Sequence, residues 1–433
     1  MKLNKVVSKF VGHSLFKNSF IYIVTDAVNK AIPFLLLPVL TFYLIPADFG
    51  IATNFNVYTS ILNIFIGISI QGAISANYYR LKRNLLSVYI FNSLVIITVI
   101  FMISLVFIYF SSDYIYGFLP VPVQYIYVAT VVAFAQAISA INLTIWQLES
   151  KSLKFGIYGI SQTVLNVGLT LIFVIPMGMG WKGRVDGYIY STLLYGVASL
   201  WFIFKSIGFK VKIKKRYIYD ALVFSLPLIP HALSMWVRTG VDRIFITQYY
   251  GEAATGLYAT GFQFGLLISF ITLSINNAYV PYLYKTLSLT DPVAQEESKT
   301  KLVKFTYLYF IFLAIMGVAM VVFSMVVIDN FLSQKYHDAK QFIPLIIASQ
   351  IFQGMYLMVV NYIFYAKRSK LLFLITFSCS MLQVLLSYFM IRKLGAMGGV
   401  YSTVIVSFVN FIGVWIYSHQ VYPMPWLKFI KGK

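Results

Sequence analysis

Long apolar runs follow one another along almost the whole chain, separated by short polar connections. A helix needs about 20 apolar residues to cross the hydrocarbon core of a bilayer. Twelve runs reach this length, at residues 18–44, 51–74, 85–110, 123–146, 155–175, 187–207, 219–247, 255–284, 305–328, 342–366, 371–391 and 396–418. The runs are too long and too continuous for the alternating strands of a membrane barrel. The pattern therefore predicts an all-α polytopic membrane protein with twelve transmembrane helices.

Composition agrees with this prediction and excludes an ordinary soluble enzyme. Hydrophobic residues make up 60% of the chain and charged residues only 11%, whereas about a quarter of an ordinary globular sequence is charged. The single cysteine, Cys379, excludes an internal disulfide framework and a cysteine-based zinc site. The four histidines are scattered, the loops are too short to hold a catalytic domain, and no GxxxxGK[ST] phosphate loop occurs. We therefore expect no enzyme activity, no cofactor and no metal site.

The distribution of basic residues predicts the orientation in the membrane. Of the 34 lysines and arginines, 25 lie in the two terminal segments and the even-numbered connections, six in the odd-numbered connections and three within spans. Basic residues concentrate on the cytoplasmic side of a membrane protein. Both termini are therefore predicted to be cytoplasmic, and the net charge of +21 is attributed to topology rather than to nucleic-acid binding.

The two halves of the chain resemble each other weakly. The segment GIATNF at 50–55 recurs as GLYATGF at 256–262, and SIQ at 69–71 recurs as SIN at 274–276. Each half then holds six spans in the same orientation, which is typical of the parallel repeats of alternating-access transporters. We predict two six-helix lobes related by a parallel pseudo-repeat, an N-terminal lobe over 1–210 and a C-terminal lobe over 211–433.

Ionisable residues inside the predicted spans are the main candidates for function. They are Asp26, Lys30, His231, Arg238, Asp242 and Arg243. A charge at the bilayer centre costs at least about 2.5–3.5 kcal/mol, so these side chains should face protein or water. In one interpretation, Asp26–Lys30 and Arg238–Asp242 form neutral pairs at i,i+4 spacing. In the other, Lys30, Arg238, Arg243 and His231 bind an anionic substrate, while Asp26 and Asp242 are candidate ion-coupling sites.

A polar stripe runs along the second predicted span at near-helical spacing. Its members are Asn56, Thr59, Ser60, Asn63 and Gln71. These side chains either form hydrogen bonds between helices or line a wet cavity that meets sugar hydroxyls. In the second interpretation, Asn56, Asn63 and Gln71 are candidate substrate-binding residues.

Several short motifs occur in a characteristic order. They are NSFIY at 18–22, PFLLLP at 33–38, LIPADFG at 44–50, SLPLIPH at 225–231, VDRIFI at 241–246, GLYA at 256–259 and Pro281. With these motifs the whole chain resembles the Wzx-type O-antigen flippases, which are polysaccharide exporters of the multidrug/oligosaccharidyl-lipid/polysaccharide superfamily.

The resemblance implies a fold, a location and a substrate. It implies a two-lobed, twelve-helix fold with a central cationic cavity, in the inner membrane of a bacterium. It implies that undecaprenyl-diphosphate-linked repeat units of O-antigen or capsule pass from the cytoplasmic to the periplasmic leaflet by alternating access. The partners it implies are this glycan, membrane lipids, an O-antigen polymerase and a chain-length regulator. No motif assigns Lys30 or Arg238 a role, so their assignment depends on the cost of burying charge.

Other functional classes make different predictions. For a cation-coupled multidrug exporter of the same superfamily we would expect a carboxylate-rich cavity. Well inside the predicted spans lie three Lys and Arg residues and only two Asp residues. A membrane glycosyltransferase or polymerase predicts a large outer loop, which is missing from the sequence. A non-transporting subunit of polysaccharide assembly stays open as an alternative. Without an ATP motif, an ion gradient, a substrate gradient or consumption of the product must drive transport.

Overall fold

The fold is described from a computed structural model of the chain. Its backbone is described for residues 2–118, 121–208, 210–289 and 291–426, and its side chains for the same residues except 2–20, 23, 113, 118, 292, 294 and 369. The side chains of the first three residues of the NSFIY motif, 18–20, therefore lie outside the described residues.

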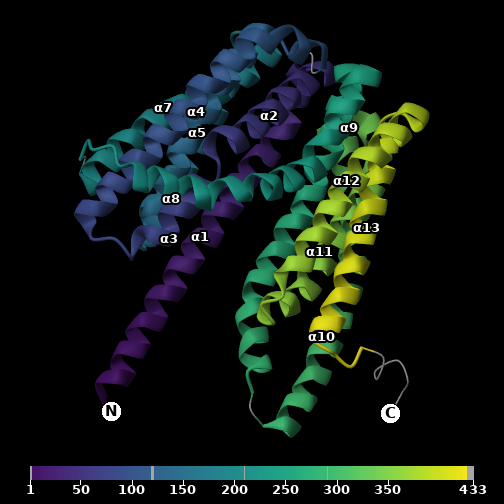
Figure 1. Cartoon of the computed structure of the whole chain (residues 1–433). Coiled ribbons are helices and arrows are strands. Elements are labelled where there is room, and N and C mark those ends of the chain that lie inside the picture. The colour runs from purple at the N-terminus through teal and green to yellow at the C-terminus, as the bar shows by residue number, and fades with distance from the viewer. Residues whose placement is uncertain (1, 119–120, 209, 290, 427–433) are drawn as a thin grey trace. The chain divides into compact units, whose positions relative to one another are not determined.

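Every regular element in these ranges is a helix (Figure 1), which confirms the all-α prediction. The α-helices are α1 (Lys2–Tyr43), α2 (Pro46–Gly67), α3 (Ile70–Tyr78), α4 (Arg83–Phe118), α5 (Val123–Leu148), α6 (Ser152–Val174), α7 (Trp181–Ile207), α8 (Lys215–Ser225), α9 (Ile229–Leu287), α10 (Pro292–Phe331), α11 (Ile343–Tyr365), α12 (Ser369–Leu394) and α13 (Ala396–Val421). Two 3-10 segments, η1 (Leu226–Leu228) and η2 (Gln334–Phe342), connect neighbouring helices.

Eleven helical segments of the described residues are long and apolar enough to cross a membrane. One of them, Lys215–Leu287, has 73 residues and contains α9. The 59 residues of α9 would extend about 90 Å, roughly three times the hydrocarbon core. The helix is broken at Gly251, where φ is 81° and only glycine avoids strain. This break separates the two crossings predicted at 219–247 and 255–284, so the eleven segments provide the twelve predicted spans.

The predicted second span differs from the observed helices. Helix α2 ends at Gly67 and α3 begins at Ile70. Between them, Ile68 and Ser69 have φ values of 40° and 57°, in the left-handed region. Gln71 therefore lies on α3, and the polar stripe that includes Asn63 does not continue to it on one helix.

The chain forms two compact units, Met1–Trp236 and Val237–Lys433. In the first unit, α6 packs between α1 and α7, and α5 packs against α2, α4 and α7. Helix α8 packs on α3 and α4, where the Asp220 carboxylate accepts hydrogen bonds from the Tyr89 hydroxyl at 2.8 Å and Asn77 Nδ2 at 3.0 Å. The two lobes predicted from the sequence repeat, 1–210 and 211–433, stay a prediction, because the compact units are defined by contacts and not by the repeat.

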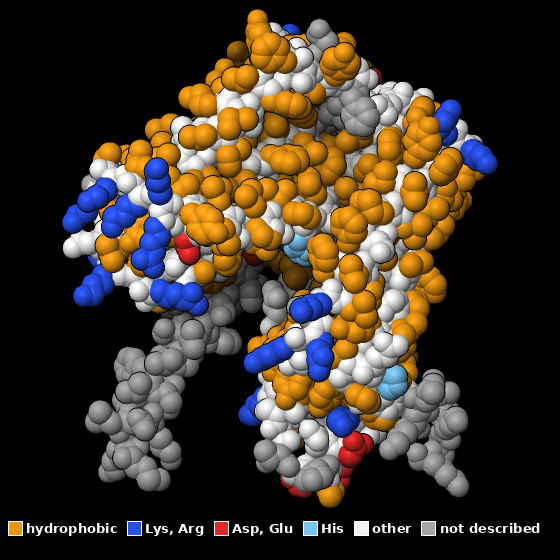
Figure 2. Space-filling model, viewed as in Figure 1, with side chains coloured by type: hydrophobic (Ala, Val, Ile, Leu, Met, Phe, Trp, Pro, Cys, Tyr) orange, Lys and Arg blue, Asp and Glu red, His pale blue; other side chains and the backbone are white. Residues whose placement is uncertain are grey.

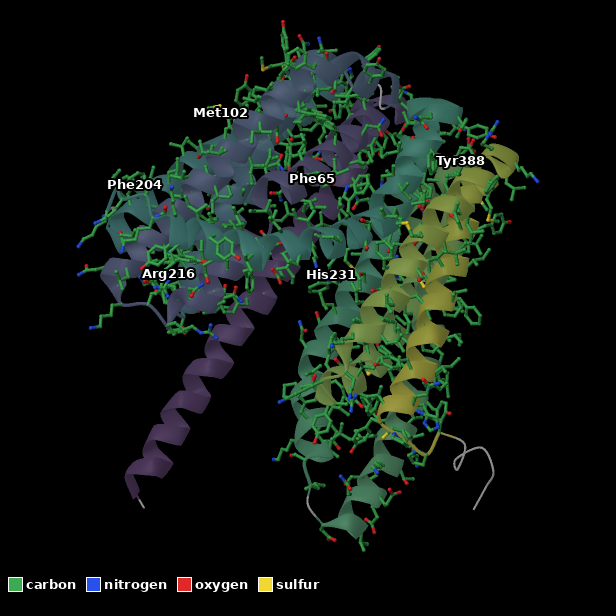
Figure 3. All side chains as sticks on the ribbon, in the orientation of Figure 1. Phe65, Met102, Phe204, Arg216, His231 and Tyr388 are labelled. Atoms are coloured by element: carbon green, nitrogen blue, oxygen red, sulfur yellow. The ribbon has the colours of Figure 1, made fainter. Side chains whose placement is uncertain are left out.

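In the second unit, α13 packs against both α11 and α12, and α10 packs against α11. Large apolar side chains remain exposed in both units, for example Ile315 at 65% in the second unit and Met102 at 54% in the first. Figure 3 labels Met102. Figure 2 shows hydrophobic side chains over most of one face, with lysine and arginine gathered in separate patches. Lipid-facing helices require such a surface, and the chain is a multi-pass membrane protein.

Candidate functional site

A small polar cavity of about 130 Å³ lies among α2, α6 and α7 in the first unit. Its lining residues are Ala52, Phe55, Asn56, Asn166, Arg184, Val185 and Tyr188. Asn56 is the one predicted substrate-binding residue among them. The cavity therefore combines one cation, two amides and one phenol from three candidate membrane spans.

Arg184 is a residue that the sequence analysis missed. It was counted in an outer connection, but it lies in the first turn of α7, inside the candidate span Trp181–Ile207. Its Nη1 donates to Thr170 Oγ1 at 3.3 Å, and Thr170 donates in turn to Asn166 Oδ1 at 3.3 Å. The ion pairs formed by described residues do not include Arg184. Since an arginine has five N–H donors, this guanidinium keeps capacity for an anionic or hydroxyl-bearing ligand.

A glycine allows the approach of α7 to α6 that places Arg184 beside Thr170. A Cβ atom at Gly187 would lie 2.6 Å from Thr170 Oγ1 and 2.8 Å from the Thr170 backbone nitrogen. Such distances are far below van der Waals contact, so position 187 tolerates no side chain at this helix separation. Arg184 lies one turn before Tyr188, which was already within the predicted span 187–207, and this spacing was a signal that could have extended the helix to Arg184.

In the second unit, Arg238 binds a neutral partner. Its Nη2 donates to the Gln353 side-chain oxygen on α11 at 2.8 Å. Among the ion pairs of the described residues there is none between Arg238 and Asp242. The interpretation in which these two residues neutralise each other is therefore not the arrangement that the structure has.

Asp242 is buried, with 4% of its surface exposed, in a cluster of neutral donors. Its carboxylate accepts from Gln383 Nε2 at 2.9 and 3.2 Å, Thr403 Oγ1 at 2.6 Å, Tyr258 OH at 3.2 Å and the Ser387 hydroxyl. These donors come from α12, α13 and α9 itself. A buried carboxylate without hydrogen bonds would be very costly, and the cluster satisfies its oxygens. The same hydroxyl and carboxylate oxygens are the ligand type that hard cations prefer.

Arg243 donates a hydrogen bond to the Thr239 backbone oxygen and lies against two aromatic rings. Its Cζ lies 4.7 Å from the centroid of the Phe262 ring and 5.7 Å from that of Tyr258. Both rings belong to the part of α9 after Gly251. The direction of Arg243 thus differs from that of Arg238, as the helical spacing predicts.

The other candidate residues lie at separate places. Asp26 and Lys30 are exposed on α1, and His231 is exposed near the start of α9. Asn63 on α2 and Gln71 on α3 are half-buried. Arg238, Asp242 and Arg243 belong to the second unit, and the remaining candidates to the first. The binding and coupling roles of all these residues stay predictions.

Comparison with protein families and relatives places the chain among polysaccharide-related membrane proteins. A family model described as "Polysaccharide biosynthesis protein" matches residues 15–287. A Haemophilus influenzae protein named "Lsg locus putative protein 1" is 26% identical over 380 residues, covering 86% of this chain and 89% of its own length. An "Uncharacterized membrane protein" of the same organism is 27% identical over 399 residues, covering 91% and 92%. The family resemblance predicted from the motifs is confirmed.

Solved structures show the same fold at low sequence identity. The inward-facing conformation of a MATE family transporter of the MOP superfamily has a TM-score of 0.74 and 13% identity, over 92% of this chain and 97% of that one. The lipid II flippase MurJ in an inward closed conformation has a TM-score of 0.74 and 14% identity, over 96% and 89%. The fold class predicted from the sequence is therefore confirmed.

Proposed function

We propose, from the premise that the chain belongs to the polysaccharide biosynthesis protein family, that it is a flippase for lipid-linked oligosaccharides. Its substrate is an undecaprenyl-diphosphate-linked repeat unit of O-antigen or capsule. It moves this unit from the cytoplasmic to the outer leaflet of the bacterial inner membrane, with both of its termini in the cytoplasm. The chain transports the unit, and a polymerase and a chain-length regulator use it afterwards.

One observation carries the proposal. Each compact unit holds an arginine inside a candidate span whose hydrogen-bond partner is a neutral oxygen, Arg184 with Thr170 and Arg238 with Gln353. A guanidinium in a membrane without a carboxylate partner is costly unless an anion visits it. The planar fork of arginine matches phosphate oxygens, and neutral partners leave its charge available for them.

The predicted site residues have different proposed roles according to their side-chain chemistry. Lys30 and His231 in the first unit and Arg238 and Arg243 in the second are each proposed to supply positive charge to the diphosphate, Lys30 and Arg238 as its direct contacts. The amides of Asn56, Asn63 and Gln71 bind sugar hydroxyls, as does the cavity beside Arg184. The polyprenyl tail stays in the lipid. Alternating access, which parallel-repeat transporters use, then exposes the glycan to the outer side.

Asp242 is the proposed coupling site, because its buried carboxylate is surrounded by several hydroxyl oxygens. A proton or a monovalent cation bound there would neutralise the carboxylate, and the hydroxyls of Ser387, Ser402 and Thr403 can turn to present oxygen lone pairs. Asp26 is the second predicted coupling residue, on the exposed face of α1.

Reconstitution tests this function. The purified chain is placed in liposomes with a fluorescent lipid-diphosphate oligosaccharide on one leaflet, and its arrival on the other leaflet is followed by a membrane-impermeant quencher. We expect protein-dependent flipping that Arg238→Ala abolishes in a normally folded protein. The chain would be a multidrug exporter instead if it flipped neither this substrate nor its phosphate-linked analogue and exported a cationic dye under an ion gradient.

A further inference from the structure

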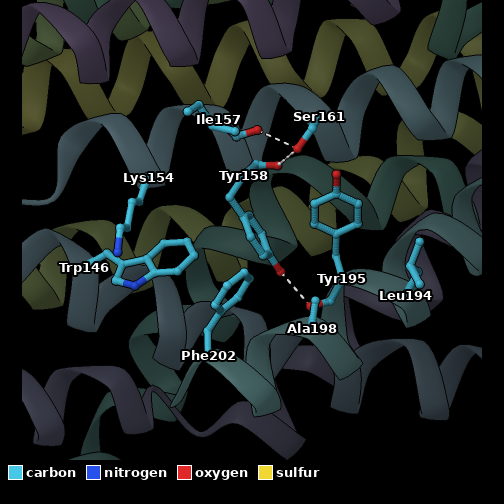
Figure 4. A pocket seen from close by; sticks show the side chains of 9 residues that line it. All are labelled: Trp146, Lys154, Ile157, Tyr158, Ser161, Leu194, Tyr195, Ala198 and Phe202. Carbon is cyan, nitrogen blue, oxygen red and sulfur yellow. Dashed lines mark hydrogen bonds between the residues drawn. The ribbon is translucent and has the colours of Figure 1, made fainter. Parts of the chain in front are cut away.

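Two apolar grooves lie on either side of helix α6 in the first unit. The first groove has a volume of about 450 Å³ and runs between α5, α6 and α7 (Figure 4). Its lining residues are Trp146, Lys154, Ile157, Tyr158, Ser161, Leu194, Tyr195, Ala198 and Phe202. Its volume is within the range of about 300–1,000 Å³ of ligand-binding pockets.

Four aromatic rings form a continuous wall of the first groove. The centroid distances along the row are 5.0 Å from Phe202 to Trp146, 5.7 Å from Trp146 to Tyr158 and 4.8 Å from Tyr158 to Tyr195. The Tyr158 hydroxyl lies 2.9 Å from Ser139 Oγ and 2.7 Å from Ser199 Oγ. Because the protein itself satisfies this hydroxyl, the ring is held in place and offers an apolar surface to the groove.

A single cation lies at one end of this wall. Figure 4 shows Lys154 beside Trp146, with Leu194 at the opposite end of the row. Lys154 is exposed, and the ion pairs among described residues do not include it, whereas its neighbour Lys151 binds Glu149 at 2.5 Å. The groove thus joins a long apolar surface to a positive charge at the start of α6.

The second groove has a volume of about 490 Å³ and lies between α1 and α6. Its lining residues are Ile21, Val24, Thr25, Leu153, Gly156, Ile157, Ile160, Ser161 and Val164. It shares Ile157 and Ser161 with the first groove, so both grooves meet on α6 just beyond Lys154. Lys154 lines the first groove and its chain neighbour Leu153 lines the second, so one cation lies close to both grooves.

We propose that this surface binds one two-chain anionic phospholipid, with its phosphate on Lys154 and one acyl chain in each groove. The one lysine matches the single phosphate of such a lipid, and the two grooves match its two acyl chains. A polyprenyl carrier has a single chain and would fill one groove only. The predicted orientation places Lys154 at the cytoplasmic side, where anionic lipids concentrate and attract basic side chains. The site is independent of the transported substrate, and it fixes α1, α5, α6 and α7 around a lipid.

Lipid titration of the full chain, followed by native mass spectrometry, tests the charge match. Phosphatidylglycerol should bind at least roughly fivefold more tightly than phosphatidylcholine, as expected for one lysine contact. Lys154→Ala should remove this preference and Lys154→Arg should keep it. Lys182→Ala, which removes an exposed lysine at the other end of α7, is the matched control and should have no effect. Equal binding of both lipids to the wild type, or an unchanged preference in Lys154→Ala, overturns the proposal.

The number of chains is tested separately. Phosphatidylglycerol should bind more tightly than its single-chain lyso form, and Val24→Trp, which fills the second groove, should abolish that advantage. Ala198→Trp, which fills the first groove, should weaken binding of both. If a tryptophan variant does not fold, the comparison of the two lipids on the wild type decides alone. Equal affinity for both lipids, or displacement of phosphatidylglycerol by a polyprenyl phosphate at equal concentration, contradicts a two-chain phospholipid site.

Discussion

Arg238 donates a hydrogen bond to the side-chain oxygen of Gln353 at 2.8 Å, across from α9 to α11. Asp242, one turn farther along α9, instead accepts hydrogen bonds from α12 and α13. Two residues at i,i+4 spacing share a helix face, yet here they serve different neighbouring helices. The positive charge of Arg238 therefore stays available for an anion.

A carboxylate at position 353 should neutralise the charge of Arg238 and so prevent it from binding an anion. Gln353→Glu would form an ion pair with Arg238 that competes with the substrate phosphate. We expect flipping to fall by roughly tenfold or more, since hydrogen bonds to charged groups contribute about 1.5–3 kcal/mol. The measurement is the flipping rate in liposomes at equal protein content. Gln353→Met is the control of similar size and should keep most of the rate; full activity of Gln353→Glu would exclude Arg238 as a phosphate contact.

The apolar pattern was sufficient to predict the helices, because length and hydropathy define a membrane span. It did not predict the break at Ile68–Ser69, since a left-handed residue leaves no mark in a continuous apolar run. Arg184 was misplaced because a charge near the end of a span resembles one in a loop. The partners of Asp242 were not predictable either, because Gln383 and Thr403 lie 141 and 161 residues away in the sequence.

Arg184 offers a test of the cavity in the first unit. Arg184→Ala should reduce flipping, because the cavity loses its only charge among the lining residues. Arg184→Lys should retain part of the activity, since charge stays while the fork is lost. Lys182→Ala, two residues earlier and exposed, controls for a general loss of charge. Equal flipping rates for Arg184→Ala and wild type would limit Arg184 to helix packing.

The close packing of α6 and α7 predicts a stability effect at Gly187. A Cβ there would meet Thr170 at 2.6–2.8 Å, including its backbone nitrogen. Gly187→Ala should therefore lower the free energy of unfolding by about 1–3 kcal/mol, the usual cost of overpacking. Gly168→Ala on α6 is the matched control, because nothing lies within 4 Å of its Cβ position. Thermal unfolding followed by tryptophan fluorescence compares the two; equal midpoints would contradict the packing argument.

The charge distribution predicts which loops are outside. On a background in which buried Cys379 is changed to Ala, cysteines at Ala253 and Lys335 should react with an impermeant maleimide in intact cells. Cysteines at Lys212 and Thr300 should react only after permeabilisation. All four positions are exposed in the structure, so accessibility to the protein surface does not limit the reaction. Labelling of position 212 from outside would reverse the predicted orientation.

Substitution of Asp242 distinguishes ion-coupled from substrate-driven transport. Its carboxylate is buried among hydroxyl and amide donors, so binding of a proton or cation there would change the charge of the second unit's interior. Asp242→Asn keeps the size and removes the charge, and it replaces one acceptor oxygen of the carboxylate with an NH2 donor. We expect the wild type to flip faster under an imposed pH or sodium gradient, and Asp242→Asn to lose that acceleration while still binding lipid-linked substrate. Thr403→Val should weaken the response without abolishing it, because only one oxygen is lost.

Asp26→Asn is the parallel test of the second proposed coupling residue, on the exposed face of α1, and it should keep the response if Asp242 alone is the coupling site. Loss of the response in Asp26→Asn alone would transfer the coupling role to Asp26. A wild type that ignores both gradients would show that consumption of the product drives transport. The Asp242 cluster would then be a structural one, in which hydrogen bonds from α12 and α13 satisfy a buried carboxylate and hold these helices against α9.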